Sequence, residues 1–140
     1  MIIIDATDLI AGRLATFAAK KAILGNQVRI INSEKAVISG KKENTLQDYL
    51  DRMARGIPRK GPFVHRSPER ILRRVVRGMI DYKKPRGKDA YQRVLCYVGV
   101  PREFEGKKTA IIEGASKSKL PNLKYITIYD ISKRLGAKLE

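Results

Sequence analysis

The sequence predicts an α/β domain with a mainly parallel β-sheet of about four strands and long basic loops. Two observations predict this class: a β-α-β pattern opens the chain, and two more strand-like runs occur later, after amphipathic helices. The chain has 140 residues, of which 43% are hydrophobic, so it can bury an independent core. We therefore expect a single domain over residues 1–140.

The N-terminal residues predict two parallel strands joined by one helix. The apolar run MIIID at residues 1–5 is typical of a short strand, and VRIIN at residues 28–32 is rich in β-branched residues. Between them, apolar residues recur at helical spacing over residues 10–22, and Gly25 indicates where the helix ends. Asp8 is expected to cap this helix. Strands joined by one crossover helix should lie parallel, with a right-handed connection.

The rest of the chain predicts shorter elements around one unassigned stretch. We expect strands at residues 36–40, 93–101 and 124–130, an amphipathic helix at residues 43–54 and a short terminal helix at residues 131–140. Residues 106–122 contain too many Gly, Lys and Ser residues for an assignment. The sequence shows no internal repeat and no break between domains.

The charge is strongly positive and unevenly distributed. Thirty Lys and Arg against fourteen Asp and Glu give a formal net charge of +16. Residues 52–93 carry 14 basic and 3 acidic residues, and ten of the fourteen arginines lie there. Such an excess costs stability by self-repulsion unless a polyanion neutralises it. Because the planar guanidinium suits phosphate contacts, the choice of arginine favours a nucleic acid as the partner.

Residues 67–80 predict a helix with one apolar face and one arginine face. Ser67 is a good N-cap and Pro68 suits the first helical position. The residues expected to face the core are Ile71, Leu72, Val75, Val76, Met79 and Ile80. The residues expected on the opposite, RNA-binding face are Arg70, Arg73, Arg74 and Arg77. Only Glu69 is placed to relieve their repulsion, so this face is expected to meet phosphates.

Two basic segments flank this helix and are expected to bind RNA with it. The loop at residues 55–66 is rich in Gly and Pro, should order only on binding, and contributes Arg55, Arg59, Lys60 and Arg66. A turn at residues 83–88 contributes Lys83, Lys84, Arg86 and Lys88. Flexible arms beside a helix suit irregular folded RNA better than a DNA major groove. Phe63, His65 and Tyr82 could stack on bases or simply pack against the core.

The sequence offers little for catalysis, cofactors or membranes. It lacks the G-x-G-x-x-G and G-x-x-x-x-G-K-[ST] motifs of nucleotide-binding proteins, and residue 32 is Asn where an acidic residue would bind a ribose. One cysteine and one histidine cannot form a structural zinc site by themselves, and Cys96 is expected to be a buried hydrophobe. No apolar run reaches the ~18 residues of a membrane span, and the N-terminus does not read as a signal peptide. We expect a cytosolic protein with no catalytic residues, cofactor or metal.

Four blocks of the sequence resemble one known family in order and spacing. They read IIDATDLIAGRLA, INSEKAVISGKK, GPFVHRSPERILRRVVRGMI and KPRGKDAYQRVLCYVGVP. Together they resemble the universal large-subunit ribosomal protein numbered thirteen, over about residues 2–105. The archaeal and eukaryotic branch is the more similar one, and the lack of a long basic C-terminal extension favours the archaeal form.

This resemblance implies a three-layer α/β/α domain and a structural role in the large ribosomal subunit. The implied partners are large-subunit ribosomal RNA of the 23S type and neighbouring ribosomal proteins, in the cytoplasm, with no DNA and no membrane. The family's RNA-facing positions fall on the 55–66 loop, the arginine face and the 83–88 turn. Two other hypotheses stay open at this point: a basic RNA-processing enzyme, and an RNA-binding regulator that acts off the ribosome.

Overall fold

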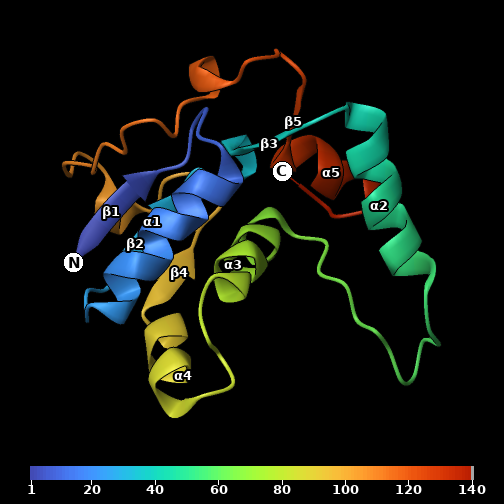
Figure 1. Cartoon of the computed structure of the whole chain (residues 1–140), viewed down its shortest axis with the longest axis horizontal. Coiled ribbons are helices and arrows are strands. Elements are labelled where there is room, and N and C mark those ends of the chain that lie inside the picture. The colour runs from blue at the N-terminus through green and yellow to red at the C-terminus, as the bar shows by residue number, and fades with distance from the viewer. Residues whose placement is uncertain (140) are drawn as a thin grey trace.

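The computed structural model describes residues 1–139 and confirms the α/β class (Figure 1). The strands are β1 (Ile2–Asp5), β2 (Val28–Ile31), β3 (Val37–Ser39), β4 (Val94–Cys96) and β5 (Tyr125–Thr127). The helices are α1 (Ala11–Ile23), α2 (Lys42–Ala54), α3 (Pro68–Gly78), α4 (Pro85–Gln92) and α5 (Ile128–Arg134), with 3-10 turns η1 (Ser33–Lys35), η2 (Arg102–Phe104) and η3 (Lys117–Lys119). Among residues 1–139, none of the helices combines the length and the hydrophobicity of a membrane span.

The parallel sheet has three strands in the order β1-β2-β4. Ile2 pairs with Val28, and Val28 pairs in turn with Val94, so β2 lies in the centre. This confirms the parallel pairing expected of the N-terminal β-α-β unit. Strands β3 and β5 do not extend this sheet; they pair with each other, antiparallel, beside it.

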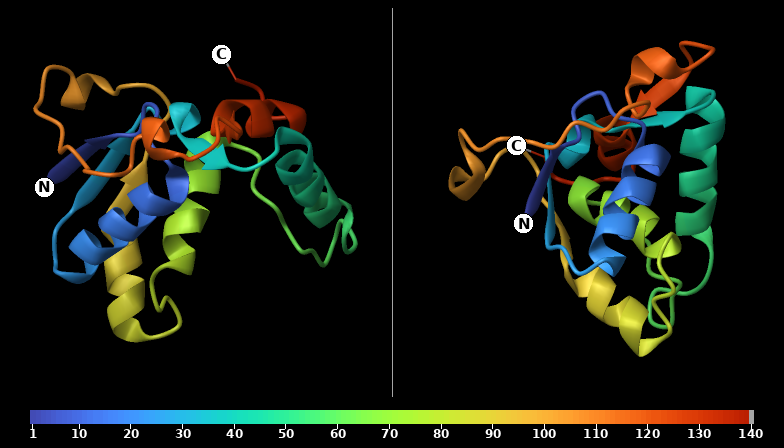
Figure 2. Two further views of the ribbon diagram at one scale, coloured as in Figure 1. Left: turned by 45° about the horizontal axis from the view of Figure 1, so that its top comes forward. Right: turned by 60° about the vertical axis from the view of Figure 1, so that its left-hand side comes forward.

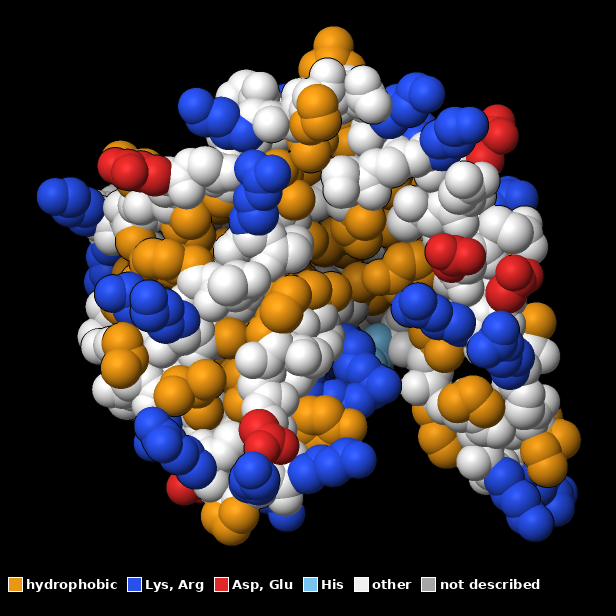
Figure 3. All heavy atoms as spheres, viewed as in Figure 1, with side chains coloured by type: hydrophobic (Ala, Val, Ile, Leu, Met, Phe, Trp, Pro, Cys, Tyr) orange, Lys and Arg blue, Asp and Glu red, His pale blue; other side chains and the backbone are white. Residues whose placement is uncertain are grey.

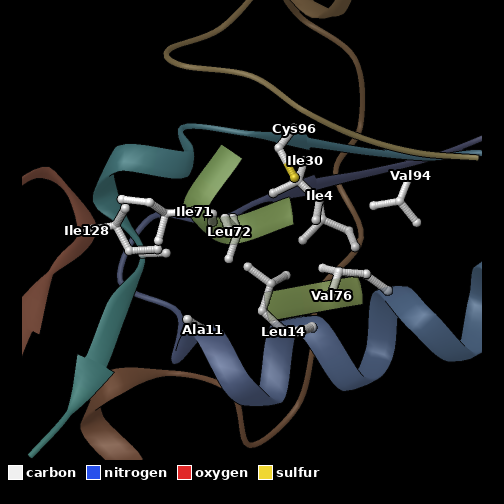
Figure 4. Packing of buried hydrophobic residues seen from close by; sticks show 14 of the residues in the cluster. Ile4, Ala11, Leu14, Ile30, Ile71, Leu72, Val76, Val94, Cys96 and Ile128 are labelled. Carbon is white, nitrogen blue, oxygen red and sulfur yellow. The ribbon is translucent and has the colours of Figure 1, made fainter. Parts of the chain in front are cut away.

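One face of the parallel sheet packs against α1, α3 and α4 (Figure 2). Side chains alternate along a strand, so Ile4 and Ile30 point to this face, where they meet Leu14, Leu72 and Val76 (Figure 4). The face that α1 buries consists mainly of alanine, which lets the helix approach the sheet closely. This layer holds the main hydrophobic core.

The opposite face of the sheet carries a smaller cover. Ile3 and Ile31 point there and pack with Phe104 of η2, while the Tyr97 ring lies 5.5 Å from the Phe104 ring, measured between centroids. A short 3-10 turn therefore covers this face where the other has three helices.

The C-terminal elements differ from the expected boundaries because a helix cap lies inside the expected strand. Thr127 ends β5 and caps α5: its side-chain oxygen accepts a hydrogen bond from the backbone N–H of Asp130 (3.3 Å). The helix expected over 131–140 therefore begins at Ile128 and ends at Arg134. The strand expected over 93–101 likewise ends early, at Cys96.

The turn expected at residues 83–88 is wrong from Pro85 onward, because α4 begins there. Pro85 occupies the first turn of α4, where its missing N–H costs no hydrogen bond. Gly87 is buried, and a Cβ atom there would lie 1.8 Å from the carbonyl oxygen of Asp81. The Pro-Arg-Gly sequence therefore starts a helix whose first turn packs closely on the preceding backbone.

Asp8 does not cap α1, contrary to the expectation from the sequence. The N-cap position is Ile10, which makes no side-chain capping bond. Asp8 lies two residues earlier with a left-handed backbone (φ 58°), and its carboxylate pairs with Lys117 at 3.1 Å. It therefore links the turn before α1 to η3.

The apolar face of α3 is narrower than its sequence pattern suggests. Ile71, Leu72, Val76 and Ile80 are buried, as expected. Val75 is only half-buried and Met79 is 45% exposed, because α1 and the sheet cover only one side of this face. Ser67 is the N-cap residue, as predicted, although its side chain makes no capping bond.

This difference predicts unequal effects of the same charge introduced at two neighbouring residues. Val76→Asp should cost on the order of 4–5 kcal/mol of unfolding free energy, since Val76 is fully buried and a carboxylate there has no partner. Val75→Asp should cost markedly less, because its side chain reaches solvent. Urea titration followed by circular dichroism measures both; equal losses would contradict the burial of α3 described above.

Candidate nucleic-acid interface

Residues 55–67 form an exposed arm between α2 and α3 (Figure 1). At its tip, Ile57 and Gly61 form an isolated antiparallel bridge, and the Gly61 N–H donates to the Ile57 carbonyl at 2.9 Å. Gly56 allows this turn: its φ is +80°, and a Cβ atom there would lie 1.9 Å from the carbonyl oxygen of Gly61. The absence of any helix within the arm agrees with the expected loop. Its ordering on RNA stays a prediction.

A cleft of about 420 Å³ lies between the arm, α2 and α3. Figure 3 shows it as a hollow that separates the arm from the body, with the single histidine visible inside. The side chains that matter here are Tyr49, Arg52, Arg55, Phe63, His65 and Arg74. Among the described residues, every charged side chain that lines the cleft is an arginine, so the cleft is suited to an anion.

Two residues of this cleft, Tyr49 and Arg52, were not expected from the sequence. The guanidinium carbon of Arg52 lies 5.3 Å from the centroid of the Tyr49 ring, on the same side of α2. Burial raises the pKa of the Tyr49 hydroxyl, although Arg52 opposes the shift, so the ring is a neutral support at physiological pH. Their spacing of three residues on a helix is the signal that could have revealed the pair.

The expected arginine face of α3 divides into two parts. Arg70 and Arg74 are exposed, and Arg74 lines the cleft. Arg73 is half-buried: its Nε donates to the Val94 carbonyl (2.9 Å), its Nη2 donates to the Tyr91 carbonyl (3.5 Å), and its guanidinium lies 4.3 Å from the Tyr91 ring centroid. Arg73 therefore joins α3 to β4.

Arg77 and the aromatic residues named from the sequence also have clear positions. Arg77 is half-buried, with its guanidinium 4.4 Å from the centroid of Tyr82. The Arg77 guanidinium therefore lies over the Tyr82 ring, on the surface where a base would stack. Phe63 is 71% exposed and lines the cleft beside His65, so a planar ligand can reach its ring.

The remaining basic residues lie at four separate places. Arg55 shares the cleft with Arg74, whereas Arg59 and Lys60 lie at the exposed tip of the arm. Arg66 is exposed just before α3, and its carbonyl accepts a hydrogen bond from Ser132 Oγ of α5. This bond fixes the base of the arm to the body.

The fourth group surrounds α4, which lies on the far side of α3 from the arm (Figure 1). Its members are Lys83, Lys84, Arg86 and Lys88, all of them exposed. Lys84 pairs with Asp81 at 3.1 Å, an exposed ion pair of small energetic value. The basic groups are therefore spread along one side of the molecule rather than gathered at one point.

Other reactive side chains have structural environments. Burial raises the pKa of the Cys96 thiol to about 12, so it is uncharged at neutral pH and a poor nucleophile. At the end of β1, burial opposes ionisation of Asp5, but hydrogen bonds from Thr7 and Asn32 outweigh it and lower the pKa of this carboxyl. Among residues 1–139, no group of three or more His, Cys, Asp or Glu side chains is placed to hold a metal ion.

Comparison with known proteins identifies similar sequences along the whole chain. Residues 1–103 match the family model of ribosomal protein L13. A large ribosomal subunit protein uL13 from Methanococcoides burtonii is 46% identical over 138 residues, 99% of each chain. The proteins of the same name from Methanosarcina barkeri and Archaeoglobus fulgidus are 43% and 42% identical, over 99% and 96% of this chain and 99% and 86% of theirs. These relatives are archaeal, as the sequence resemblance implied.

The divided arginine face predicts that Arg73 differs from its neighbours in stability. Arg73→Gln should lower the unfolding free energy by about 1.5–3 kcal/mol, the usual value of hydrogen bonds from a charged group. Arg70→Gln and Arg74→Gln, which remove exposed side chains, should each change it by less than about 0.5 kcal/mol. Thermal and urea unfolding of the three variants checks this. An unchanged unfolding free energy in Arg73→Gln would show that Arg73 does not anchor α3.

Proposed function

Because the chain belongs to the ribosomal protein L13 family, archaeal branch, we propose that it is a structural constituent of the large ribosomal subunit, in which it binds and stabilises ribosomal RNA. The observation that carries the RNA-binding role is the cleft between the arm and α3, whose charged lining residues are arginines. RNA phosphates would neutralise the self-repulsion of a chain with a net charge of +16.

The basic residues divide into phosphate-binding and supporting roles in this proposal. Exposed side chains on the arm, on α3 and around α4 face phosphates; they are Arg55, Arg59, Lys60, Arg66, Arg70, Arg74, Lys83, Lys84, Arg86 and Lys88. Arg73 and Arg77 keep part of their guanidinium surface toward the RNA while they hold α3 in place. Basic groups spread over an arm and two helices suit the irregular surface of folded RNA.

The same proposal extends to the surroundings of the protein. The RNA is of the 23S type, the protein acts as one domain over residues 1–140, and neighbouring ribosomal proteins contact it in cytoplasmic subunits. No specific observation favours the two other hypotheses from the sequence, an RNA-processing enzyme or a regulator off the ribosome. The buried, protonated Cys96 and the hydrogen-bonded Asp5 have structural roles.

The subunit assignment predicts how the protein sediments. After separation of a lysate on a sucrose gradient, most of the protein should be found with large subunits, and it should stay there through moderate salt washing. Immunoblotting of the fractions measures this. Recovery mainly in free or DNA-bound fractions would contradict the proposal.

The phosphate contacts predict a change in the salt dependence of RNA binding. Replacing Arg70 and Arg74 together by Gln should lower the slope of log K against log salt by roughly 1.4–1.8, at about 0.7–0.9 per lost phosphate contact. The matched control replaces Lys108 and Lys119 by Gln, which removes the same charge from exposed positions outside the basic segment. An unchanged slope in the arginine variant, or an equal change in the control, would show that α3 does not meet phosphates.

A further inference from the structure

We infer that the cleft between the arm and α3 holds one unpaired RNA nucleotide, with its base on Phe63 and its phosphate between Arg52, Arg55 and Arg74. This inference rests on the proposed function, because it takes the ligand of the protein to be ribosomal RNA. It adds a recognition mode: the arm binds a nucleotide that has left its helix, whereas the other basic surfaces bind the backbone.

The size of the cleft favours a single nucleotide over a helical stem. Its volume of about 420 Å³ falls within the roughly 300–1,000 Å³ typical of small-molecule sites. Three elements enclose it, since α2, the arm and α3 each contribute lining residues. A paired stem presents stacked bases and buries their faces, so only an unpaired nucleotide can bring a base face into this space.

Phe63 provides the surface for a base. A ring that is 71% exposed offers apolar area to a ligand, and covering that area on binding is favourable. The ring also lies against the backbone of Gly61: a Cβ atom there would be 3.2 Å from two ring carbons of Phe63. Gly61 therefore lets the ring lie close to the arm with its exposed surface available for stacking.

Arginines from two walls provide the charge for a phosphate. Arg52 and Arg55 lie at the end of α2, and Arg74 faces them from α3. All three are exposed, and within residues 1–139 none of them forms an ion pair with a carboxylate. Their guanidinium groups are therefore available to an anion that enters the cleft, and a phosphate matches their planar donors.

The experiment compares two RNA probes and three variants of the full chain. The probes are a short single-stranded oligonucleotide of mixed sequence and the duplex formed with its complement. The variants are Phe63→Ala, Phe63→Tyr, which keeps the ring, and Ile57→Ala, which removes another exposed apolar side chain from the arm outside the cleft. The affinity and its salt slope are measured for each combination of probe and variant, and thermal melting confirms that each variant is folded.

Phe63→Ala should weaken binding of the single strand about tenfold or more with an unchanged salt slope, and should leave duplex binding unchanged. Phe63→Tyr and Ile57→Ala should bind both probes like the original chain. Equal binding of the single strand by Phe63→Ala, or an equal loss with the duplex, would overturn the nucleotide assignment while the proposed function stands. Failure of the original chain to bind either probe in a salt-dependent way would instead contradict the proposed function itself.

Photocrosslinking in intact large subunits provides an independent readout. Ultraviolet irradiation followed by digestion and mass spectrometry should yield an RNA–peptide adduct on Phe63 or His65. An acidic segment of a neighbouring protein is the alternative occupant of an arginine-lined cleft. A protein–protein crosslink to the cleft residues, without an RNA adduct, would overturn the inference.

Discussion

Burial of one side of α3 against α1 and the parallel sheet is the constraint on which the rest of the structure depends. Leu72 and Val76 are fully buried, and Arg73 adds hydrogen bonds from the same helix to the carbonyls of Val94 and Tyr91. The helix also contacts α5 and η1, so it joins the parallel sheet to the C-terminal part of the fold. Because the arm leads into α3 and α4 follows it along the chain, the position of α3 sets the position of both.

Arginine side chains have two different roles in this strongly basic protein. Some arginines act within the fold: Arg93 donates to the carbonyl of Ala22 at the end of α1 (3.0 Å), and Arg29 donates to the carbonyl of Arg93 (2.9 Å). Both carbonyls also accept backbone hydrogen bonds, Ala22 from the Gly25 N–H (3.1 Å) and Arg93 from the Val28 N–H (2.9 Å), so each guanidinium adds a second bond to the same oxygen. Among residues 1–139, the exposed Arg70 and Arg74 have no such role, and their repulsion in the free protein is the cost of the surface proposed to bind RNA.

The arm shows how backbone geometry shapes the proposed binding surface from residues that cannot form a core. Gly56 and Gly61 both have positive φ, and the close approach at Gly56 leaves no room for a side chain. The bond from Ser132 to the Arg66 carbonyl fixes the point where the arm rejoins the body. With its ends held by α2 and α3, the arm keeps Phe63 and His65 beside the cleft.

The sequence by itself determined the α/β class, the parallel β-α-β unit, the buried residues at the centre of α3 and the segments that carry the basic charge. These features follow from local periodicity and composition, which one stretch of chain expresses alone. Only the tertiary structure decided that β3 and β5 pair apart from the parallel sheet, and that Asp8 pairs with Lys117 instead of capping α1. It also decided that Arg73 binds backbone carbonyls while Arg74 remains exposed, and that Tyr49 and Arg52 complete a cleft with Phe63. Neighbouring residues on one helix face look equivalent in the sequence. Their roles differ because each contacts a different segment that is distant along the chain.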